Sequence, residues 1–376
     1  MLDQSTQRGV PFLDLAGLHA GIKADVLARL EGLIDRSEFG TGAAVHEFEA
    51  AFGEFCGAVE CVGVASGLDG LRFLLEAAGI GAGDEVIVPA MTFVATFEAV
   101  SQVGATPVPV DVSGDDYTLD PAAADAAVGP RTRALVPVHL YGQLADMTRL
   151  VPIAERHGLT VVEDACQAHG ARRAGVRPGQ GTYGAVYSFY PGKNLGAMGD
   201  AGAVVTDDPA TGSHLRKLRE HGQSEKYRHD LIGWTSRLDA FQAAVLAAKL
   251  PYLEGWNEER RGVARLYAEL LAGVGDLVLP RLAPDSEHVW HLYVVRTADP
   301  AALAAHLSAR SIATGRHYPV PPHLTDAYAG LGYAPGAFPV AEELGRTALS
   351  LPIFPGMTET QVEAVAEAVG DYFRSS

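Results

Sequence analysis

The alternation of short apolar runs with longer helical patterns, between about residues 58 and 207, constrains the fold more than any other feature of the sequence. Strands that are apolar on both faces need helices on both faces of their sheet, which is typical of a mostly parallel sheet in an α/β fold. Ligands of such folds bind beyond the carboxyl ends of the strands, so the residues that follow each run are candidates for a site. The runs are rich in Val and are bounded by Gly, Pro or Asp: Cys61–Ala65, Glu85–Pro89, Thr106–Val110, Ala134–Val138, Thr160–Glu163, Ala185–Phe189 and Ala203–Thr206.

The pattern changes after residue 208, where helical spacing dominates. One further strand is expected at Leu292–Arg296 and a helix at Pro300–Ser308, and Thr358 with Gln361 forms a capping box for a last helix. A chain of 376 residues is too long for one compact core. We therefore expect a large ligand-binding domain over residues 1–250 and a smaller C-terminal α/β domain over residues 251–376.

The balance of charge is strongly acidic, with 29 basic and 46 acidic residues and a net charge of −17. Such a surface repels nucleic acid and anionic membranes, and no apolar stretch approaches the length that spans a bilayer. The three cysteines and thirteen histidines show no metal-binding or disulfide spacing. We expect a cytoplasmic protein with reduced thiols and without a metal, a nucleic-acid partner or a membrane anchor.

Two candidate features follow the first two runs. Ser66-Gly67-Leu68-Asp69 comes directly after the first run and opens a helical pattern, so free N–H groups at this turn could face an anion. An ordinary strand-to-helix turn would look the same. Phe93 follows the second run and could stack on a flat ring, although an aromatic side chain at this place is usually part of the core.

Two further features carry ionisable groups. Asp164 follows the run Thr160–Glu163 and could pair with a protonated pyridine nitrogen, or it could cap a helix. Lys193 lies in a glycine-rich loop after the run Ala185–Phe189, where burial would lower its pKa and make its amine a nucleophile for an aldehyde. The alternative is a solvated loop lysine. The combination of Lys193 with Asp164 and the Ser66–Asp69 turn argues against that alternative.

Three motifs together resemble the DegT/DnrJ/EryC1/StrS aminotransferases: Ser66–Asp69, Glu163–Gly170 and Ser188–Gly196. The resemblance extends from Val10 to Ile353. It implies a fold-type-I transferase that binds pyridoxal 5'-phosphate (PLP) and forms a homodimer with shared active sites. Within the family, Gly233–Asp239 and His317–Leu324 are similar to the branch that acts on nucleotide-linked 3-keto-deoxyhexoses.

The resemblance also implies roles for single residues around the cofactor. Lys193 would form the Schiff base with PLP and then move protons, and Asp164 would pair with the pyridine nitrogen. Gln167 would lie near the phenolic oxygen, and Phe93 would stack on the ring.

The phosphate and the sugar would have their own contacts. In the turn at Gly67, the backbone N–H groups of Leu68 and Asp69 would bind the phosphate, with help from the Ser188 hydroxyl. Thr235 stands where many family members have an asparagine that reaches the phosphate of the partner subunit. A threonine hydroxyl can donate one hydrogen bond there but is shorter. His317 and Tyr318 would lie near the sugar.

The predicted reaction is a two-stage transamination in deoxyamino-sugar and antibiotic biosynthesis. The amino group would come from an amino acid, expected to be L-glutamate, and pass to a dTDP-linked 3-keto-6-deoxyhexose. Lys226 and Tyr227, in a compact cluster with Arg228 and His229, could bind the nucleotide diphosphate or form a solvated turn.

Other functions remain open at this stage. The acceptor could be a keto-cyclitol or an oxidised aminoglycoside, because pocket shape cannot be inferred from the sequence. A PLP-dependent sugar dehydratase is a second alternative, and some dehydratases of the family replace the lysine with histidine, whereas Lys193 is present here. A non-catalytic sugar-nucleotide binder is a third, against which the Lys193–Asp164 pair argues.

Overall fold

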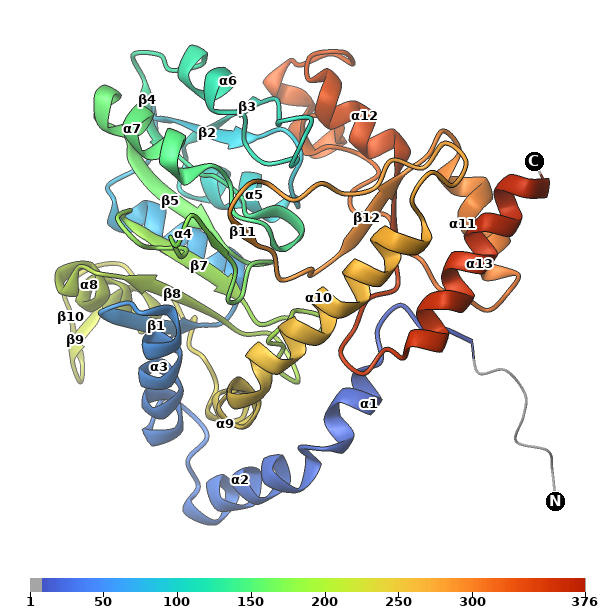
Figure 1. The fold of residues 1–376 in the computed structure, drawn as a ribbon. Helices are drawn as coiled ribbons and strands as arrows, with labels where there is room; N and C mark the ends of the chain where they lie inside the picture. The colour runs from blue at the N-terminus through green and yellow to red at the C-terminus, as the bar shows by residue number, and fades with distance from the viewer. Residues whose placement is uncertain (1–8, 376) are drawn as a thin grey trace.

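A seven-stranded sheet forms the centre of the molecule in the computed structural model, which describes residues 9–375 (Figure 1). The spatial order is β1-β8-β7-β5-β4-β2-β3; β8 is antiparallel to both of its neighbours, and the other paired strands are parallel. This confirms the predicted mostly parallel sheet. The strands are β1 (Glu60–Val64), β2 (Glu85–Pro89), β3 (Thr106–Val110), β4 (Thr132–Leu135), β5 (Thr160–Asp164), β7 (Gly184–Ser188) and β8 (Gly202–Thr206).

Strand β4 ends at Leu135, three residues before the predicted end. Pro137 has no N–H group and cannot continue the ladder as a donor. Its carbonyl instead accepts from the Asp164 N–H at 2.9 Å, and the His139 N–H donates to the Asp164 carbonyl at 2.9 Å. These two hydrogen bonds extend the pairing beyond β4 and hold the end of β5, and with it Asp164, at the edge of the sheet.

Helices cover both faces of the sheet because successive strand residues point to opposite sides. Val162 and Val204 pack with α4 (Gly67–Ala77), α5 (Ala95–Gln102) and α8 (Pro209–Arg219). Their neighbours Val161 and Val205 lie in the cores of the opposite face. That face is covered by α3 (Ala43–Cys56), α6 (Pro121–Ala126), α7 (Met147–His157) and α9 (Ala240–Lys249), and the predicted covering of both faces is confirmed.

The C-terminal part has its own antiparallel pair, β12 (Tyr293–Arg296) with β13 (Ala348–Leu351). Around it lie α10 (Leu253–Leu270), α11 (Pro300–Ser308), α12 (Pro339–Thr347) and α13 (Glu359–Ser375). Thr358 and Gln361 exchange two backbone-to-side-chain bonds of 2.9 and 3.3 Å, as the capping box predicts. Val10 packs into this core and pairs with Ile312, so both ends of the chain contribute to it. The division near residue 250 stays a prediction.

Smaller elements complete the described chain. Helices α1 (Leu15–Ala20) and α2 (Lys23–Arg36) lead from the C-terminal part to α3, and two short strand pairs lie outside the main sheet. These pairs are β6 (Arg172–Arg173) with β11 (Ser286–Glu287), and β9 (Gln223–Glu225) with β10 (Arg228–His229). Figure 1 shows the β9–β10 pair at the edge of the molecule, beside α8.

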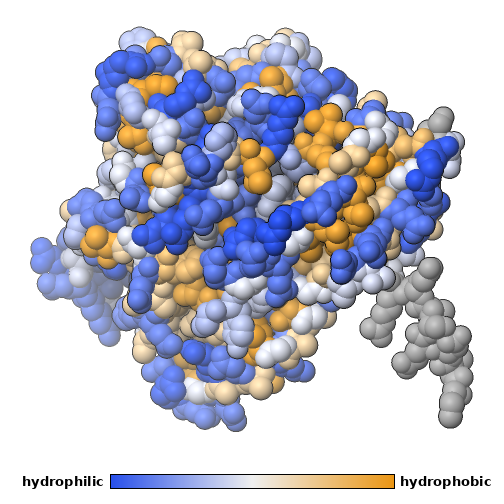
Figure 2. All heavy atoms as spheres, viewed as in Figure 1, coloured by the Kyte–Doolittle hydropathy of each residue, from blue (hydrophilic) through white to orange (hydrophobic). Residues whose placement is uncertain are grey.

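The surface is mainly hydrophilic in the view of Figure 2, and apolar residues gather over the C-terminal elements at its right. Within residues 9–375, no helix combines the length and the apolar character needed to cross a bilayer. Cys56 and Cys61 are buried, Cys166 is partly buried, and all three are free thiols. Among the same residues, no cluster of three or more His, Cys, Asp or Glu side chains could hold a metal ion.

Candidate active site

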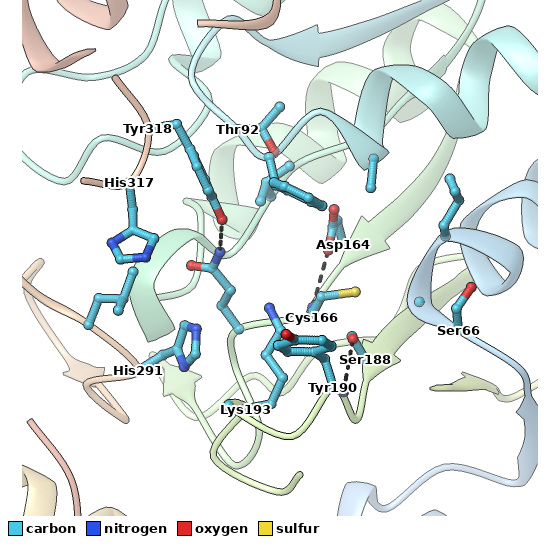
Figure 3. Close-up of a pocket in the computed structure, with 18 of the residues that line it drawn as sticks. Ser66, Thr92, Asp164, Cys166, Ser188, Tyr190, Lys193, His291, His317 and Tyr318 are labelled. Carbon is cyan, nitrogen blue, oxygen red and sulfur yellow. Dashed lines mark hydrogen bonds between the residues drawn. The ribbon is translucent and has the colours of Figure 1, made fainter. Parts of the chain in front are cut away.

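A cavity of about 510 Å³ opens at the carboxyl edge of the sheet and brings most of the predicted site residues together. It is flanked by Ser66 on one side and by His291, His317 and Tyr318 on the other, with Asp164 and Lys193 between them (Figure 3). The predicted residues that line it are Gly67, Leu68, Phe93, Asp164, Gln167, Ser188, Lys193, His317 and Tyr318.

The first turn of α4 forms one end of the cavity. Ser66 caps the helix, and its hydroxyl accepts from the Asp69 N–H at 3.1 Å. The first N–H groups of a helix have no intrahelical acceptor, so those of Gly67 and Leu68 are left for an anion. The Asp69 N–H is already bonded to the Ser66 hydroxyl, and its contact with a phosphate stays a prediction. The Asp69 carboxylate instead accepts from Arg72 at 2.6 Å and Ser236 at 2.8 Å.

Glycine is required at Gly67 by the close approach of the neighbouring strand ends. A Cβ at this position would lie 2.7 Å from Cys166 Sγ and 2.9 Å from Ser188 Cβ. The helix can therefore approach the ends of β5 and β7 closely enough for its N-terminus to border the same cavity as Asp164 and Lys193.

Asp164 is fixed through both of its carboxylate oxygens. Oδ2 accepts from the Thr96 hydroxyl at 2.9 Å, and Oδ1 accepts from the Cys166 N–H at 3.1 Å. The residue is 6% exposed and still borders the cavity. Such a carboxylate can stabilise a positive charge on a bound ring, and it is not a helix cap, because no helix begins after β5 before the short β6.

Lys193 enters the cavity from the glycine-rich loop, whose turn is closed by its N–H donating to the Tyr190 carbonyl at 2.8 Å. Burial lowers the pKa of its amine, and the charges of Cys166 and Asp164 act in the opposite direction. Within the part of the chain that the structure describes, the amine has no hydrogen-bond or ion-pair partner. It is therefore available as a nucleophile.

Gln167 and Tyr318 form a connected pair beside Lys193. The Gln167 carbonyl oxygen accepts from the Tyr141 N–H at 2.6 Å, which leaves its amide nitrogen to donate to the Tyr318 hydroxyl at 3.1 Å. Burial, followed by the Asp164 charge, raises the pKa of Tyr318, so its hydroxyl keeps its proton and can donate. Phe93 is 52% exposed at the cavity, with its ring centroid 5.4 Å from that of Tyr318.

His317 borders the same side of the cavity. Its Nδ1 lies 2.8 Å from the Ser350 hydroxyl. Burial, with a smaller effect of Lys193, lowers the pKa of the imidazole to about 4, so the ring is neutral near pH 7. A neutral imidazole and a phenol can exchange hydrogen bonds with the hydroxyl groups of a polar ligand.

Besides Asp69, three predicted residues lie outside the cavity. Thr235 is exposed, and its hydroxyl is 2.9 Å from His221 Nε2. Lys226 and Tyr227 form the exposed turn of the β9–β10 pair, with the ammonium 5.3 Å from the ring centroid. The contacts predicted for these residues therefore do not form with the cavity of their own chain.

Several residues that border or support the cavity were missed from the sequence. Thr96 holds Asp164 from helix α5, and Cys166 contributes both its N–H and its thiol. Burial and the nearby Asp164 raise the pKa of that thiol. His291 comes from the loop before β12. No spacing or periodicity marks Thr96 or His291, since each reaches the site through tertiary packing.

The chain is similar to proteins of known activity over nearly its full length. The sequence model of the DegT/DnrJ/EryC1/StrS aminotransferase family matches residues 21–370. A dTDP-3-amino-3,4,6-trideoxy-alpha-D-glucose transaminase of Streptomyces venezuelae is 49% identical over 363 residues, which are 96% of each chain.

Solved structures agree with this relationship. The S. venezuelae DesV structure, in complex with a ketimine intermediate, has a TM-score of 0.96 and 48% identity, covering 98% of this chain and 99% of that one. The ntda structure from Bacillus subtilis, with bound cofactor PMP, has a TM-score of 0.92 and 30% identity, covering 99% of this chain and 87% of that one. With sequence and fold in agreement, the chain is an aminotransferase and belongs to the DegT/DnrJ/EryC1/StrS aminotransferase family.

Proposed function

We propose that this aminotransferase uses PLP, bonded through Lys193, to move an amino group from L-glutamate to the keto group of a dTDP-linked 3-keto-6-deoxyhexose. The observation that carries the proposal is the meeting of Lys193, Asp164 and the first turn of α4 in one cavity. The sugar is suggested by the name of the S. venezuelae relative, a dTDP-3-amino-sugar transaminase.

The residues of the cavity fit PLP by their chemistry. The N–H groups of Gly67 and Leu68 suit its phosphate, and the Gly67 position admits no side chain. The carboxylate of Asp164 suits its ring nitrogen, and the amine of Lys193 suits its aldehyde. When bound, PLP supplies a protonated ring that takes up the electrons of the bond broken at the donor's α-carbon.

The protein would supply orientation and proton movement. Asp164, held by Thr96 and the Cys166 N–H, would keep the ring nitrogen protonated. Lys193, once displaced by the donor, would take the proton from the α-carbon, for which its lowered pKa favours the required neutral form. His317 and Tyr318 would bind sugar hydroxyls at the opposite side of the cavity.

A second copy of the chain would complete the site. Phe93 and Tyr190 border the cavity and are 52% and 59% exposed. The β9–β10 turn exposes Tyr227, and the segment after β10 exposes Ile232 and Trp234. Apolar side chains exposed on this scale are typical of an interface. In a homodimer with shared active sites, Lys226, Tyr227 and Thr235 would reach the partner's cavity. The diphosphate of the sugar nucleotide and the phosphate of PLP would lie there.

Spectroscopy and trapping test this function directly. The purified protein should take up PLP and absorb visible light, borohydride should fix the cofactor on Lys193, and glutamate should remove the visible band. Adding the dTDP-keto sugar should restore the band and give an aminated product. Keto-cyclitols and oxidised aminoglycosides serve as competing acceptors. A protein that never binds PLP, or whose band persists with glutamate, would refute the proposal.

A further inference from the structure

His291 borders the cavity from the loop between β11 and β12, and the function proposed above gives it no role. Its ring lies on the same side of the cavity as His317 in Figure 3. His291 and Lys193 both line this cavity, and burial, followed by the charge of Lys193, lowers the pKa of His291. A partly buried imidazole in this position can act on the lysine if its ring nitrogens have defined roles.

The hydrogen bonds of Asn194 define the role of His291 Nδ1. The Asn194 amide nitrogen donates to the Val289 carbonyl at 2.8 Å and to Asn257 Oδ1 at 2.9 Å. Asn257 is oriented in turn, because its own amide nitrogen donates to the His169 carbonyl at 2.9 Å. The Asn194 side-chain oxygen therefore faces His291 Nδ1 at 3.1 Å and can only accept, so Nδ1 must carry the proton.

The loop around His291 is held from its other side by Arg260. This buried guanidinium donates to the carbonyls of Trp290, His291 and Ile353 at 3.1, 3.4 and 2.9 Å. Trp290 has a φ of +46°, which is rare for a residue with a side chain and is maintained where surrounding contacts require it. Its N–H donates to His288 Nδ1 at 2.8 Å, and the two rings stack. The imidazole of His291 is thus fixed in place through backbone and side chain.

The second ring nitrogen is free to accept. Burial, followed by the charges of Lys193, Arg260, His169 and His317, lowers the pKa of His291, so the ring stays neutral. A neutral ring protonated at Nδ1 has a lone pair at Nε2. In the described part of the chain no group donates to this nitrogen, and the side chain borders the cavity that holds the unpartnered amine of Lys193.

We propose that His291 is a positioning residue for Lys193: its Nε2 accepts an N–H of the lysine amine once the amino-acid donor has displaced that amine from the cofactor. Asn194 follows Lys193 in the chain and holds His291 Nδ1, so one short segment fixes the lysine backbone and the imidazole relative to each other. The bond would keep the released amine over the cavity, ready for proton transfer. The inference rests on the proposed function, in which Lys193 is released during each turnover.

Two substitutions separate this role from a structural one. In H291N the side-chain amide lies near the former Nδ1 and can still bond Asn194, but the acceptor at the Nε2 position is lost. In H291Q the amide oxygen lies near the former Nε2 and can accept from Lys193. We expect H291N to lower kcat about 10- to 100-fold with KM for the keto sugar changed less than about threefold, and H291Q to recover most of kcat. A purely structural role predicts the opposite order.

The tautomer gives a second measurement that does not depend on activity. Nitrogen-15 spectra of histidine-labelled holoenzyme should show one ring, absent in H291Q, that is neutral and protonated at Nδ1 near pH 7. A positively charged ring, or one protonated at Nε2, would overturn the inference, as would wild-type kcat in H291N. The visible band of bound PLP keeps the two proposals apart. If the wild-type protein lacks the band, the proposed function fails. If the wild-type protein and both variants show it, a change in kcat concerns the role of His291.

Discussion

Among single residues, Asp164 has the most defined surroundings of the candidate site. One of its carboxylate oxygens accepts from the Thr96 hydroxyl, which comes from helix α5 on one face of the sheet. The other oxygen accepts from the Cys166 N–H in the loop after β5. A carboxylate held in this way needs little reorganisation when a positive charge forms next to it, and such preorganised groups often dominate catalysis. The position of Asp164 follows from β5, whereas its orientation depends on Thr96.

Replacement of this carboxylate tests its electrostatic role. We expect D164A to lower kcat by roughly 100-fold or more, because an electrostatic contact of this kind is typically worth about 3–4 kcal/mol. Steady-state turnover with saturating PLP measures the effect. The matched control is D326A, since Asp326 is exposed and outside the cavity. Turnover of D164A close to that of D326A would contradict the role.

At the scale of helices and strands, the contact between α4 and the ends of β5 and β7 determines whether the N-terminus of α4 reaches the cavity. An added Cβ at Gly67 would meet Cys166 Sγ at 2.7 Å and Ser188 Cβ at 2.9 Å, so G67A must push the helix away. We expect PLP affinity to fall by roughly 10-fold or more and the free energy of unfolding to fall by about 1–3 kcal/mol, the usual cost of overpacking. PLP titration and thermal melting measure the two effects.

The glycine substitution G81A, in the loop between α4 and β2, provides the control. A Cβ there would have the Val103 carbonyl at 3.7 Å as its nearest neighbour, which is an ordinary contact. G81A should therefore keep the PLP affinity of the wild-type protein. If G67A bound PLP as tightly as G81A, the first turn of α4 would not be part of the phosphate site.

The elements also show what the sequence can and cannot predict. Strands β2 and β3 and helix α11 have the predicted bounds, because apolar runs and Pro or Asp boundaries are local features. Strand β13 was missed, although its residues are all buried. Its pairing with β12 joins segments far apart in the chain, and such pairing leaves no local pattern. For the same reason Lys193 and Asp164 could be found from their positions after strands, whereas Thr96 and His291 could not.

At the scale of the whole molecule, buried neutral histidines make stability depend on pH. Burial lowers the pKa of His169 and His288 to about 3, and of His317 to about 4. The unfolded chain takes up these protons near the ordinary value of 6.5, so between pH 6.5 and 4 it binds more protons than the folded chain. Stability should be complete above pH 6.5 and fall as the pH drops through this window.

Urea unfolding at several pH values checks this expectation. Each such histidine contributes up to about 1.4 kcal/mol per pH unit to the slope. H288Q removes one of these groups and should make the slope shallower, whereas H229Q, in the exposed strand β10, should leave it unchanged. A free energy of unfolding that is flat between pH 6.5 and 4.5 would show that these rings become protonated without cost in the folded state.

Two copies of the molecule are needed for a complete site if the β9–β10 turn serves the partner's cavity. Lys226 is exposed and does not border the cavity of its own chain, whereas Lys193 lies inside it. K193A should therefore be inactive, and K226A should bind the nucleotide sugar poorly because a cation near the diphosphate is lost.

Mixed dimers of the two variants decide which cavity Lys226 serves. In a mixed dimer, one site combines the intact Lys193 of one subunit with the intact Lys226 of the other. If sites are shared, unfolding and refolding an equal mixture should restore about a quarter of wild-type activity, since about half of the dimers are mixed and one of their two sites is whole. If Lys226 acted on the cavity of its own chain, every cavity with an intact Lys193 would lack Lys226. Mixing would then restore no activity.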